Sequence, residues 1–258
     1  MLAHQRQELI LDAVRAHGGV RVADLVERLG VSEMTVRRDI GELSRQGLVA
    51  RVHGGAAALG RSSEEPGFAA KSTLRTDAKR AVARAALRFA EPGASVALSA
   101  GTTTAALAAE LPAVPGLTVL TNSPRVADLL HGQGPTVIQA GGVRTPSDAL
   151  VGPVARASLT GLHVDVLFLG VHGLDVRAGL TTPNLLEADT NRALMDCAAR
   201  VVVVADASKH GVVGLTSFAG LDAVDVLVTD DTLDPTDRTT LADHVGELVI
   251  AEPLEDLR

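Results

Sequence analysis

One short segment of the chain places hydroxyl, apolar and guanidinium side chains where they could contact a DNA duplex. These residues are Ser32, Met34, Thr35, Arg37 and Arg38. Met34, Thr35, Arg37 and Arg38, together with Glu33, lie off the apolar stripe that Val36, Ile40 and Leu43 form on a helix, so they are predicted to point away from the core. Guanidinium groups pair with guanine or phosphate, hydroxyl groups bond to either, and apolar groups contact thymine methyls. The spacing therefore predicts a surface that binds DNA.

The elements around this surface follow the order of a helix-turn-helix. Residues 22–29 carry the apolar period of a short helix, and Gly30 supplies the turn that follows. Ser32 is placed to cap the next helix, which Gly47 ends in a left-handed conformation. In a helix-turn-helix the second helix lies in the major groove, with its N-terminal residues against base edges. The predicted turn and cap thus present the surface to DNA.

The flanking segments predict a winged form of this module. An opening helix, which ends near Gly18 and Gly19, is predicted to bury the face that comprises Leu9, Ile10, Ala13 and Val14. Residues 48–55 are predicted to form a β-ribbon whose Arg51 and His53 contact the DNA backbone or the minor groove. The alternative is a three-helix packing module whose arginines form only a solvated face. The order of turn, cap, double arginine and ribbon favours DNA binding.

The rest of the chain alternates short Val- and Leu-rich runs with helical stretches. This alternation predicts a doubly wound, largely parallel α/β sheet. The expected strands are 95–98, 117–121, 137–140, 164–169, 201–205, 224–229 and 248–250. Ligands of such sheets lie beyond the carboxyl ends of the strands, so the residues that follow each strand are candidate ligands.

A Gly-Thr loop after the first of these strands is the main candidate anion site. Gly101, Thr102, Thr103 and Thr104 open a helix directly, where backbone N–H groups and hydroxyls favour an anion. The further effector-binding candidates at strand ends and rim loops are Asn122, Gly141, Gly142, Arg144, His172, Glu187 and Lys209. Lysine occurs only at 71, 79 and 209, which makes Lys209 a candidate point charge on an anion. A Gly-Thr turn that merely caps a helix is the alternative, and several polar strand ends on one rim favour a ligand site.

Composition narrows the class of protein. The chain has 258 residues, of which 46% are hydrophobic, so it can form one large and one small domain. It contains no run of 18 apolar residues and no basic leader, which predicts a soluble, cytoplasmic protein with no membrane partner. Cys197 is the single cysteine, and Cys and His show no metal-ligand spacing. We therefore expect no disulfide, no metal site and no cofactor.

Charge divides the chain into two parts. The net charge of −7 taken alone argues against nucleic acid. Residues 1–88, however, contain 15 Lys and Arg against 10 Asp and Glu, which gives +5, while residues 89–258 contain 9 against 21, which gives −12. A DNA-binding head on a separate acidic body explains this division, and chance clustering is the alternative.

A linker is predicted between the two parts. Residues 56–66 lack an apolar period, and 60–66 form a polar run of Gly, Arg, Ser, Glu and Pro. We therefore predict a winged helix-turn-helix at 1–57, a linker at 58–70 and an α/β domain at 71–258. Residues 71–89 are predicted to begin the second domain as one basic helix that faces solvent, with direct DNA contact as the alternative.

Both parts of the chain resemble the DeoR family of bacterial regulators. The N-terminal signature comprises residues 21–25, 31–40, 43, 47 and 52–55, and the C-terminal motifs comprise 101–104, 121–123, 141–144, 150–153, 168–171 and 205–209. The resemblance implies a sensor domain similar in fold to phosphosugar isomerases. It implies that Ser32, Thr35, Arg37 and Arg38 recognise DNA, and that the 101–104 loop holds a phosphate near Asn122 and Lys209. Ser99 and His172 depart from the family pattern, which leaves the sugar unidentified.

These observations imply a transcription factor that represses sugar-metabolism genes and whose affinity for operator DNA changes when a phosphorylated sugar binds. Paired half-sites require at least a dimer, so a homo-oligomer, a dimer or tetramer, is expected. The alternative is a phosphosugar isomerase with an accessory DNA-binding head, in which Asp148, Glu187 or Asp206 is the base. No acid pair with a lysine occurs in one loop, so no catalytic residue is assigned. A DNA-bound protein without a ligand is the third interpretation.

Overall fold

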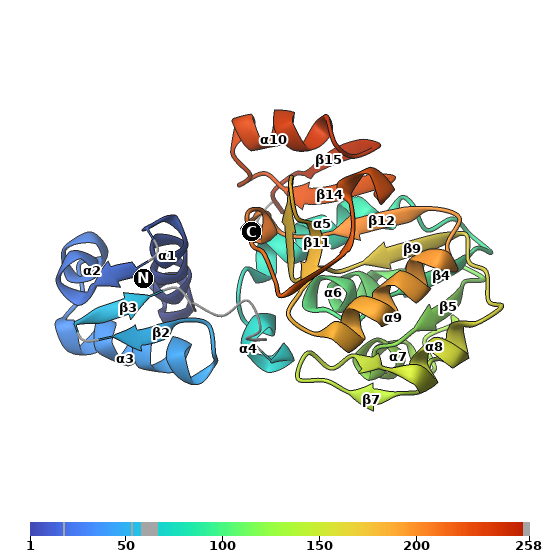
Figure 1. Cartoon of the computed structure of the whole chain (residues 1–258), viewed down its shortest axis with the longest axis horizontal. Coiled ribbons are helices and arrows are strands. Elements are labelled where there is room, and N and C mark those ends of the chain that lie inside the picture. Colours follow the sequence, from blue (N-terminus) through green and yellow to red (C-terminus); the bar gives the residue numbers. More distant parts are fainter. Residues whose placement is uncertain (18, 53, 58–66, 255–258) are drawn as a thin grey trace. The chain divides into compact units, whose positions relative to one another are not determined.

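The computed structural model describes residues 1–17, 19–52, 54–57 and 67–254. His53, which is predicted to contact DNA, lies outside these residues. Contacts within the chain divide it into two compact units, Met1–Arg75 and Thr76–Arg258 (Figure 1). Each unit has its own hydrophobic core.

The N-terminal unit is a winged helix-turn-helix. Its elements are α1 (Ala3–His17), β1 (Gly19–Arg21), α2 (Val22–Leu29), α3 (Glu33–Arg45), β2 (Ala50–Val52) and β3 (Gly55–Ala57). β3 pairs antiparallel with β1 on one side and β2 on the other. The three helices bury an apolar core that includes Ile10, Leu25 and Leu43. β1 is not predicted from the sequence, because three residues are too short to show an alternation and their partner strand lies beyond α3.

Local signals set the ends of α2 and α3. Gly30 ends α2 with a φ of 64°, a left-handed conformation that glycine adopts without steric cost. The hydroxyl of Ser32 caps α3 by accepting a hydrogen bond from the Thr35 N–H at 3.3 Å. At the other end Gly47 has a φ of 67°, and the N–H of Leu48 donates to the Leu43 carbonyl at 2.9 Å. The predicted turn and both predicted caps are therefore confirmed.

The prediction that Leu9 of α1 is buried is wrong. Leu9 is 37% exposed, whereas Leu11, which was not predicted to face inward, is buried. α1 contacts both β1 and α3. Its buried face therefore follows these two neighbours rather than the periodicity of the helix alone.

Residues 67–75 belong to the N-terminal unit and divide the helix predicted over 71–89. They form α4 (Phe68–Ser72) and a turn, after which α5 (Thr76–Leu87) begins. Leu74 is buried in the core of the N-terminal unit. Arg75 has a φ of 50°, which interrupts the helix, while its N–H donates to Glu8 and its guanidinium pairs with Asp12. Part of the predicted linker is thus helical, because α4 includes Phe68–Ala70.

The C-terminal unit is built on a seven-stranded parallel sheet. Its strands are β4 (Ser95–Leu98), β5 (Thr118–Thr121), β6 (Thr136–Gln139), β9 (Val166–Leu169), β12 (Val201–Val204), β14 (Val226–Asp230) and β15 (Glu247–Ala251). They lie in the order β15-β14-β12-β9-β4-β5-β6, and every neighbouring pair is parallel. All seven strands expected from the sequence are present, with ends shifted by at most two residues. The predicted doubly wound α/β class is confirmed.

Helices cover both faces of this sheet (Figure 1). On one face α5, α6 (Thr102–Glu110) and α7 (Pro124–Leu130) pack on alternate strand residues such as Val96, Leu98 and Phe168. On the other face α8 (Pro153–Leu159), α9 (Leu185–Asp196) and α10 (Pro235–Ala242) contribute to a second core with Ala97 and Leu167. Alternating strand residues therefore serve two separate cores, as a sheet buried on both faces requires.

Short antiparallel strands complete the C-terminal unit. They are β7 (Val143–Arg144), which pairs with β8 (Leu150–Val151), and a three-stranded sheet of β10 (Gly173–Asp175), β11 (Gly179–Thr182) and β13 (Thr216–Ala219). None of them is predicted from the sequence, since two to four residues show too little periodicity. Among the described residues, no helix combines the length and apolar character needed to cross a bilayer.

Phe168 lies at the centre of the sheet, fully buried on β9 beside Leu98 of β4 and Val202 of β12. Phe168→Ala is expected to lower the free energy of unfolding by about 3–5 kcal/mol, because it leaves a cavity where three strands meet. Denaturant unfolding followed by far-UV circular dichroism measures the change. Thr239→Ala on α10, where the residue is exposed, should change it by less than about 0.5 kcal/mol. Equal losses in both variants would contradict the assignment of the core.

Candidate DNA-binding and effector sites

The first turn of α3 combines capping with exposed polar groups. Ser32 is exposed, accepts the Thr35 N–H, and shares a second hydrogen bond with the Thr35 hydroxyl at 2.9 Å. Met34 beside them is 81% exposed, although methionine is an apolar residue. Such exposure is unfavourable in water unless a partner covers the side chain. The first turn is thus capped by hydrogen bonds and exposes an apolar side chain.

Arg37 and Arg38 of α3 are both exposed but have different surroundings. Arg37 forms an ion pair with Glu33 one turn earlier, with Nε donating to Oε1 at 2.8 Å. Arg38 lines a hollow between α3 and the start of α1. Arg51 is exposed on β2 of the wing. The structure therefore places Met34, Thr35, Arg37 and Arg38 on one helix, with Ser32 at its N-cap and Arg51 on the adjoining ribbon.

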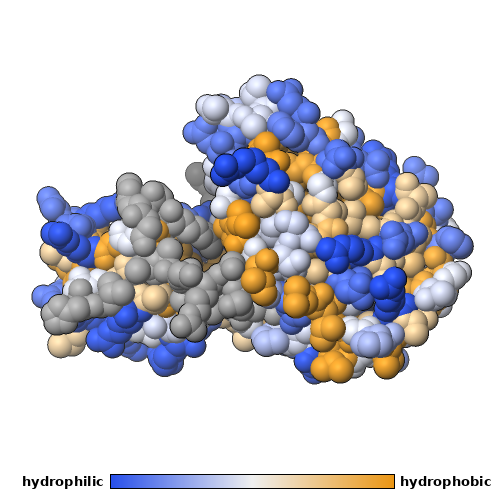
Figure 2. All heavy atoms as spheres, viewed as in Figure 1, coloured by the Kyte–Doolittle hydropathy of each residue, from blue (hydrophilic) through white to orange (hydrophobic). Residues whose placement is uncertain are grey.

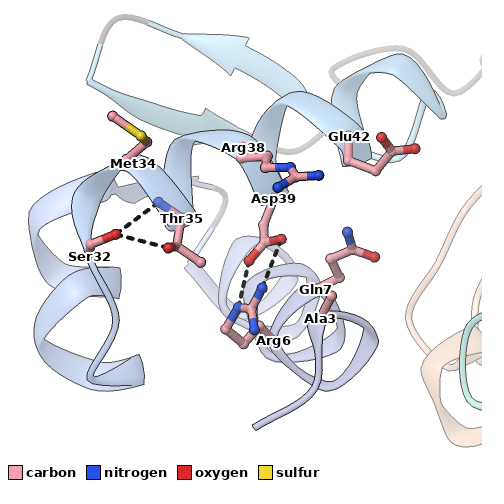
Figure 3. Close-up of a pocket in the computed structure, with 9 residues that line it drawn as sticks. All are labelled: Ala3, Arg6, Gln7, Ser32, Met34, Thr35, Arg38, Asp39 and Glu42. Atoms are coloured by element: carbon pink, nitrogen blue, oxygen red, sulfur yellow. Dashed lines mark hydrogen bonds and ion pairs between the residues drawn. The ribbon is translucent and has the colours of Figure 1, made fainter.

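The α1–α3 hollow contains three charged residues that are not among the site residues predicted from the sequence: Arg6, Asp39 and Glu42. It is lined by Ala3, Arg6 and Gln7 of α1, by Ser32, and by Met34, Thr35, Arg38, Asp39 and Glu42 of α3. Figure 3 shows Arg6 and Asp39 pointing toward each other across it. The guanidinium of Arg6 donates from Nε to Asp39 Oδ2 at 2.7 Å and from Nη2 to Oδ1 at 3.3 Å. The one signal in the sequence that could have indicated this pair is Asp39, a carboxylate directly beside the apolar position Ile40.

In the C-terminal unit the strand order reverses between β4 and β9, the first and fourth strands of the sheet in the chain. Such a reversal is where doubly wound sheets bind ligands, because the two following segments leave toward opposite faces. The hydroxyl of Ser99, directly after β4, accepts the N–H of Gly170, directly after β9, at 2.9 Å. Ser99 departs from the family pattern, and here it joins the two strand ends.

The Gly101–Thr104 loop opens α6, as the sequence predicts. Thr103 and Thr104 are buried, and the Thr104 hydroxyl donates to the Gly101 carbonyl at 3.0 Å. The first intrahelical bond runs from the Ala105 N–H to Gly101. The N–H groups of Thr102, Thr103 and Thr104 therefore have no partner within the helix ladder, which suits them to an anion. Only Thr102 has a partly exposed side chain among the three threonines.

Asn122 fixes the neighbouring strand end. Its Oδ1 accepts the Ala100 N–H at 3.0 Å, its Nδ2 donates to the Leu150 carbonyl at 3.1 Å, and its own carbonyl accepts the Leu150 N–H at 2.8 Å. The residue is 1% exposed. Its amide thus holds the Gly-Thr loop and the β7–β8 hairpin in place, and a ligand role would have to use its remaining N–H.

The loop after β6 brings glycines and an arginine to the same edge of the sheet. Gly142 has a φ of 139°, and a Cβ there would lie 2.8 Å from the backbone of Val151, so only glycine fits. The N–H of Gly141 donates to Ser158 at 3.2 Å. Arg144 pairs with Asp148 at 2.9 Å, and this hydrogen bond raises the pKa of Arg144. The Arg144 side chain is therefore held by the hairpin.

Glu187 is surrounded by hydroxyl groups. Its Oε1 accepts from Thr145 at 2.8 Å and from Ser147, and its Oε2 accepts from Thr182 at 3.1 Å. These three residues are buried. The carboxylate thus joins the β7–β8 hairpin to β11 from the first turn of α9, which Asn184 caps.

His172 and Lys209 follow adjacent strands. His172 is partly exposed in the short segment between β9 and β10, and Lys209 is partly exposed at the end of the 3-10 helix Ala207–Lys209, after β12. Since β4, β9 and β12 are neighbours and parallel, the Gly-Thr loop, His172 and Lys209 all lie at one edge of the sheet. Gly141 and Asn122 follow β6 and β5 at the same edge.

Comparison with known proteins gives the family. Residues 6–61 match the DeoR-like helix-turn-helix domain, and residues 74–231 match the DeoR C terminal sensor domain. The chain is 39% identical to the HTH-type transcriptional regulator GlpR of Haloferax volcanii, over 92% of this chain and 94% of that protein. It is 36% identical to the putative aga operon transcriptional repressor of Escherichia coli O157:H7, over 88% and 86%. The chain belongs to the DeoR family of DNA-binding transcriptional regulators.

Two further comparisons bear on enzyme function. The glycerol-3-phosphate regulon repressor of Escherichia coli K12 is 31% identical over 93% of this chain and 96% of that protein. Ribose 5-phosphate isomerase A of Methanocaldococcus jannaschii is 18% identical, with a TM-score of 0.40 over 52% of this chain and 54% of that chain. At that score the structural likeness says nothing about activity. The relatives that match along the whole chain are named as transcriptional regulators, so the comparisons support a regulator and do not favour the isomerase alternative.

Asn122→Asp tests the hydrogen bonds by which the Asn122 side chain joins the strand ends. At pH 7 the new carboxylate would face the Leu150 carbonyl without a proton to donate, so unfolding should cost about 2 kcal/mol less than in the parent. Below the pKa of that carboxyl, which the carbonyl raises, the proton restores the donor and the deficit should shrink. Denaturant unfolding of Asn122→Asp and Asn122→Ala at pH 7 and pH 5 measures this difference. The deficit of Asn122→Ala should be the same at both pH values. If the deficit of Asn122→Asp does not change with pH either, the hydrogen bond from Asn122 to the Leu150 carbonyl is contradicted.

Proposed function

We propose that the chain is a repressor of sugar-metabolism genes that works as a homo-oligomer in the cytoplasm. In this proposal the N-terminal unit binds double-stranded operator DNA, and a phosphorylated sugar at the carboxyl edge of the sheet changes its affinity. The observation that carries the proposal is the exposed, rigidly capped α3 in a chain of this family. Relatives named as repressors of the aga operon and the glycerol-3-phosphate regulon support repression rather than activation, and they support a phosphorylated sugar as the effector.

The DNA contacts follow from the exposure of α3. In our proposal Arg38, Thr35 and Met34 reach base edges, because the N-terminal half of a recognition helix faces the major groove. Arg37 and Arg51 bind phosphates, and Ser32 contributes through the cap it forms. His53 belongs to the same proposal by its place in the wing.

The effector contacts follow from the strand ends. In our proposal the N–H groups of Thr102, Thr103 and Thr104 hold the phosphate, with Gly101 allowing its approach, and Lys209 adds a positive charge. The same hypothesis assigns the sugar hydroxyls to the edge that includes Asn122, Gly141, Gly142, Arg144, His172 and Glu187. Asn122 and Glu187 already bond to the protein, so their contribution is to hold the loops in the binding geometry.

Self-association has support on the surface of the C-terminal unit. Large apolar side chains are exposed there, including Val143, Val154, Leu185, Leu186, Val213 and Leu215. Figure 2 shows several apolar clusters on the visible face of this unit. Exposed apolar patches on a globular protein commonly mark interfaces. A dimer or tetramer presents paired heads to paired half-sites, and effector binding then changes operator affinity through a coupling of about 1–3 kcal/mol.

Arg38→Ala is expected to weaken operator binding by about 1–3 kcal/mol, because a bidentate contact to a base is lost. The measurement is a fluorescence-anisotropy titration of the protein onto labelled DNA from its own upstream region. The label must be on the DNA, since the chain has no Trp and no Tyr. A parallel titration with random duplex separates base from phosphate contacts. An unchanged operator affinity would remove Arg38 from the interface.

Lys209→Met is expected to raise the phosphosugar concentration that releases operator DNA by about tenfold or more, because one charge-assisted contact to the phosphate is lost. The same anisotropy assay, with sugar phosphates and their unphosphorylated sugars, measures it. Arg88→Met is the matched control, since Arg88 pairs with Glu247 at the opposite, amino edge of the sheet. Equal shifts in both variants, or release by the unphosphorylated sugar alone, would overturn the phosphate site.

A further inference from the structure

The recognition helix α3 carries a carboxylate on its inward side. Asp39 directly follows Arg38, and its side chain is only 6% exposed. A carboxylate removed from water is strongly unfavourable unless it is paired and hydrogen-bonded. The partner that satisfies it therefore decides how α3 sits in the unit.

That partner comes from α1. Arg6 is 13% exposed, and its guanidinium meets both oxygens of Asp39, as Figure 3 shows. A third donor, Nη1, bonds to the Met1 carbonyl at 3.1 Å. The planar guanidinium thus ties the start of the chain, α1 and the recognition helix together in a bidentate geometry.

This ion pair restricts the rotation of α3 relative to α1 more than the apolar core does. Ile10, Val36 and Ile40 hold α1 against α3, but apolar burial depends on area and tolerates small rotations. A bidentate pair tolerates far less, because both N–H···O bonds must stay aligned. Thr35 lies one helical turn before Asp39 and Arg38 is adjacent to it, and both line the same hollow. A rotation of α3 would therefore displace both DNA-facing side chains.

We propose that Arg6 is a positioning residue for DNA recognition, which acts through Asp39 to fix the rotation of α3. The inference rests on the proposed DNA interface of α3. Base contacts need side chains within hydrogen-bond reach of particular atoms, whereas phosphate contacts tolerate small displacements. Loss of the pair should therefore reduce the preference for operator over random DNA more than it reduces binding to DNA in general.

The test uses the full chain and Arg6→Lys, which keeps the positive charge but cannot form the bidentate pair. Anisotropy titrations measure the affinity for operator and for random duplex at one salt concentration, below the melting temperature of each variant. We expect operator affinity to fall about tenfold and random-duplex affinity to change less than about twofold. Asp39→Asn should have the same effect, and Arg6→Lys in the Asp39→Asn background should add less than about twofold.

Three outcomes would overturn the proposal. Equal losses on operator and random duplex would make Arg6 a phosphate contact. A lower melting temperature with an unchanged operator preference would make the pair merely structural. Additive effects in the double variant would show that Arg6 does not act through Asp39. If Arg6→Lys does not fold, Asp39→Asn alone distinguishes the positioning role from the first two of these outcomes.

Two controls separate this proposal from the one on which it rests. Arg45→Lys alters an ion pair with Glu42 on the same helix whose arginine is 75% exposed, and it should change neither affinity by more than about twofold. Arg38→Ala tests the interface itself. An effect of Arg38→Ala without an effect of Arg6→Lys refutes only the positioning role, while no effect of Arg38→Ala removes Arg38 from the proposed interface.

Discussion

All seven strands of the main sheet run parallel, so their carboxyl ends share one edge, and the chemistry of the C-terminal unit depends on that constraint. At this edge the hydroxyl of Ser99 joins β4 to the segment after β9, and Asn122 joins the Gly-Thr loop to the β7–β8 hairpin. The loops that carry Gly101 and Lys209 therefore start from backbone positions that the sheet has already set. In our proposal a ligand at this edge meets N–H groups that the protein already holds in place, rather than groups that the ligand must order itself.

The DNA-binding unit positions its exposed side chains with a much smaller core. Its small core orients three helices, while the cap at Ser32 and the left-handed Gly47 set the ends of α3. Polar pairing adds the direction that burial does not supply, through Arg6 and Asp39. The exposed side chains of α3 are thus held by a rigid helix rather than a loop, which favours precise contacts.

The chain leaves the DNA-binding unit through a segment that is fixed to α1. Leu74 is buried in the core of that unit, and Arg75 bonds to Glu8 and Asp12 of α1. The same helix holds α3 through Arg6. A continuous series of contacts therefore runs within the N-terminal unit from its last residue to the recognition helix. Arg75 is therefore held by packed side chains and ion pairs of its own unit.

The sequence by itself determined the elements whose signals are local. The turn at Gly30, the cap at Ser32 and the seven parallel strands all depend on residues a few positions apart, and periodicity records such relations. Only the tertiary structure decided which distant groups meet: Arg6 with Asp39, Arg75 with Asp12, Ser99 with Gly170, and Glu187 with Thr145 and Ser147. It also decided that Leu11 rather than Leu9 is buried, and that Thr103 and Thr104 turn inward. Pattern alone does not contain these pairings, because they arise from the packing of segments that lie 33 to 71 residues apart in the chain.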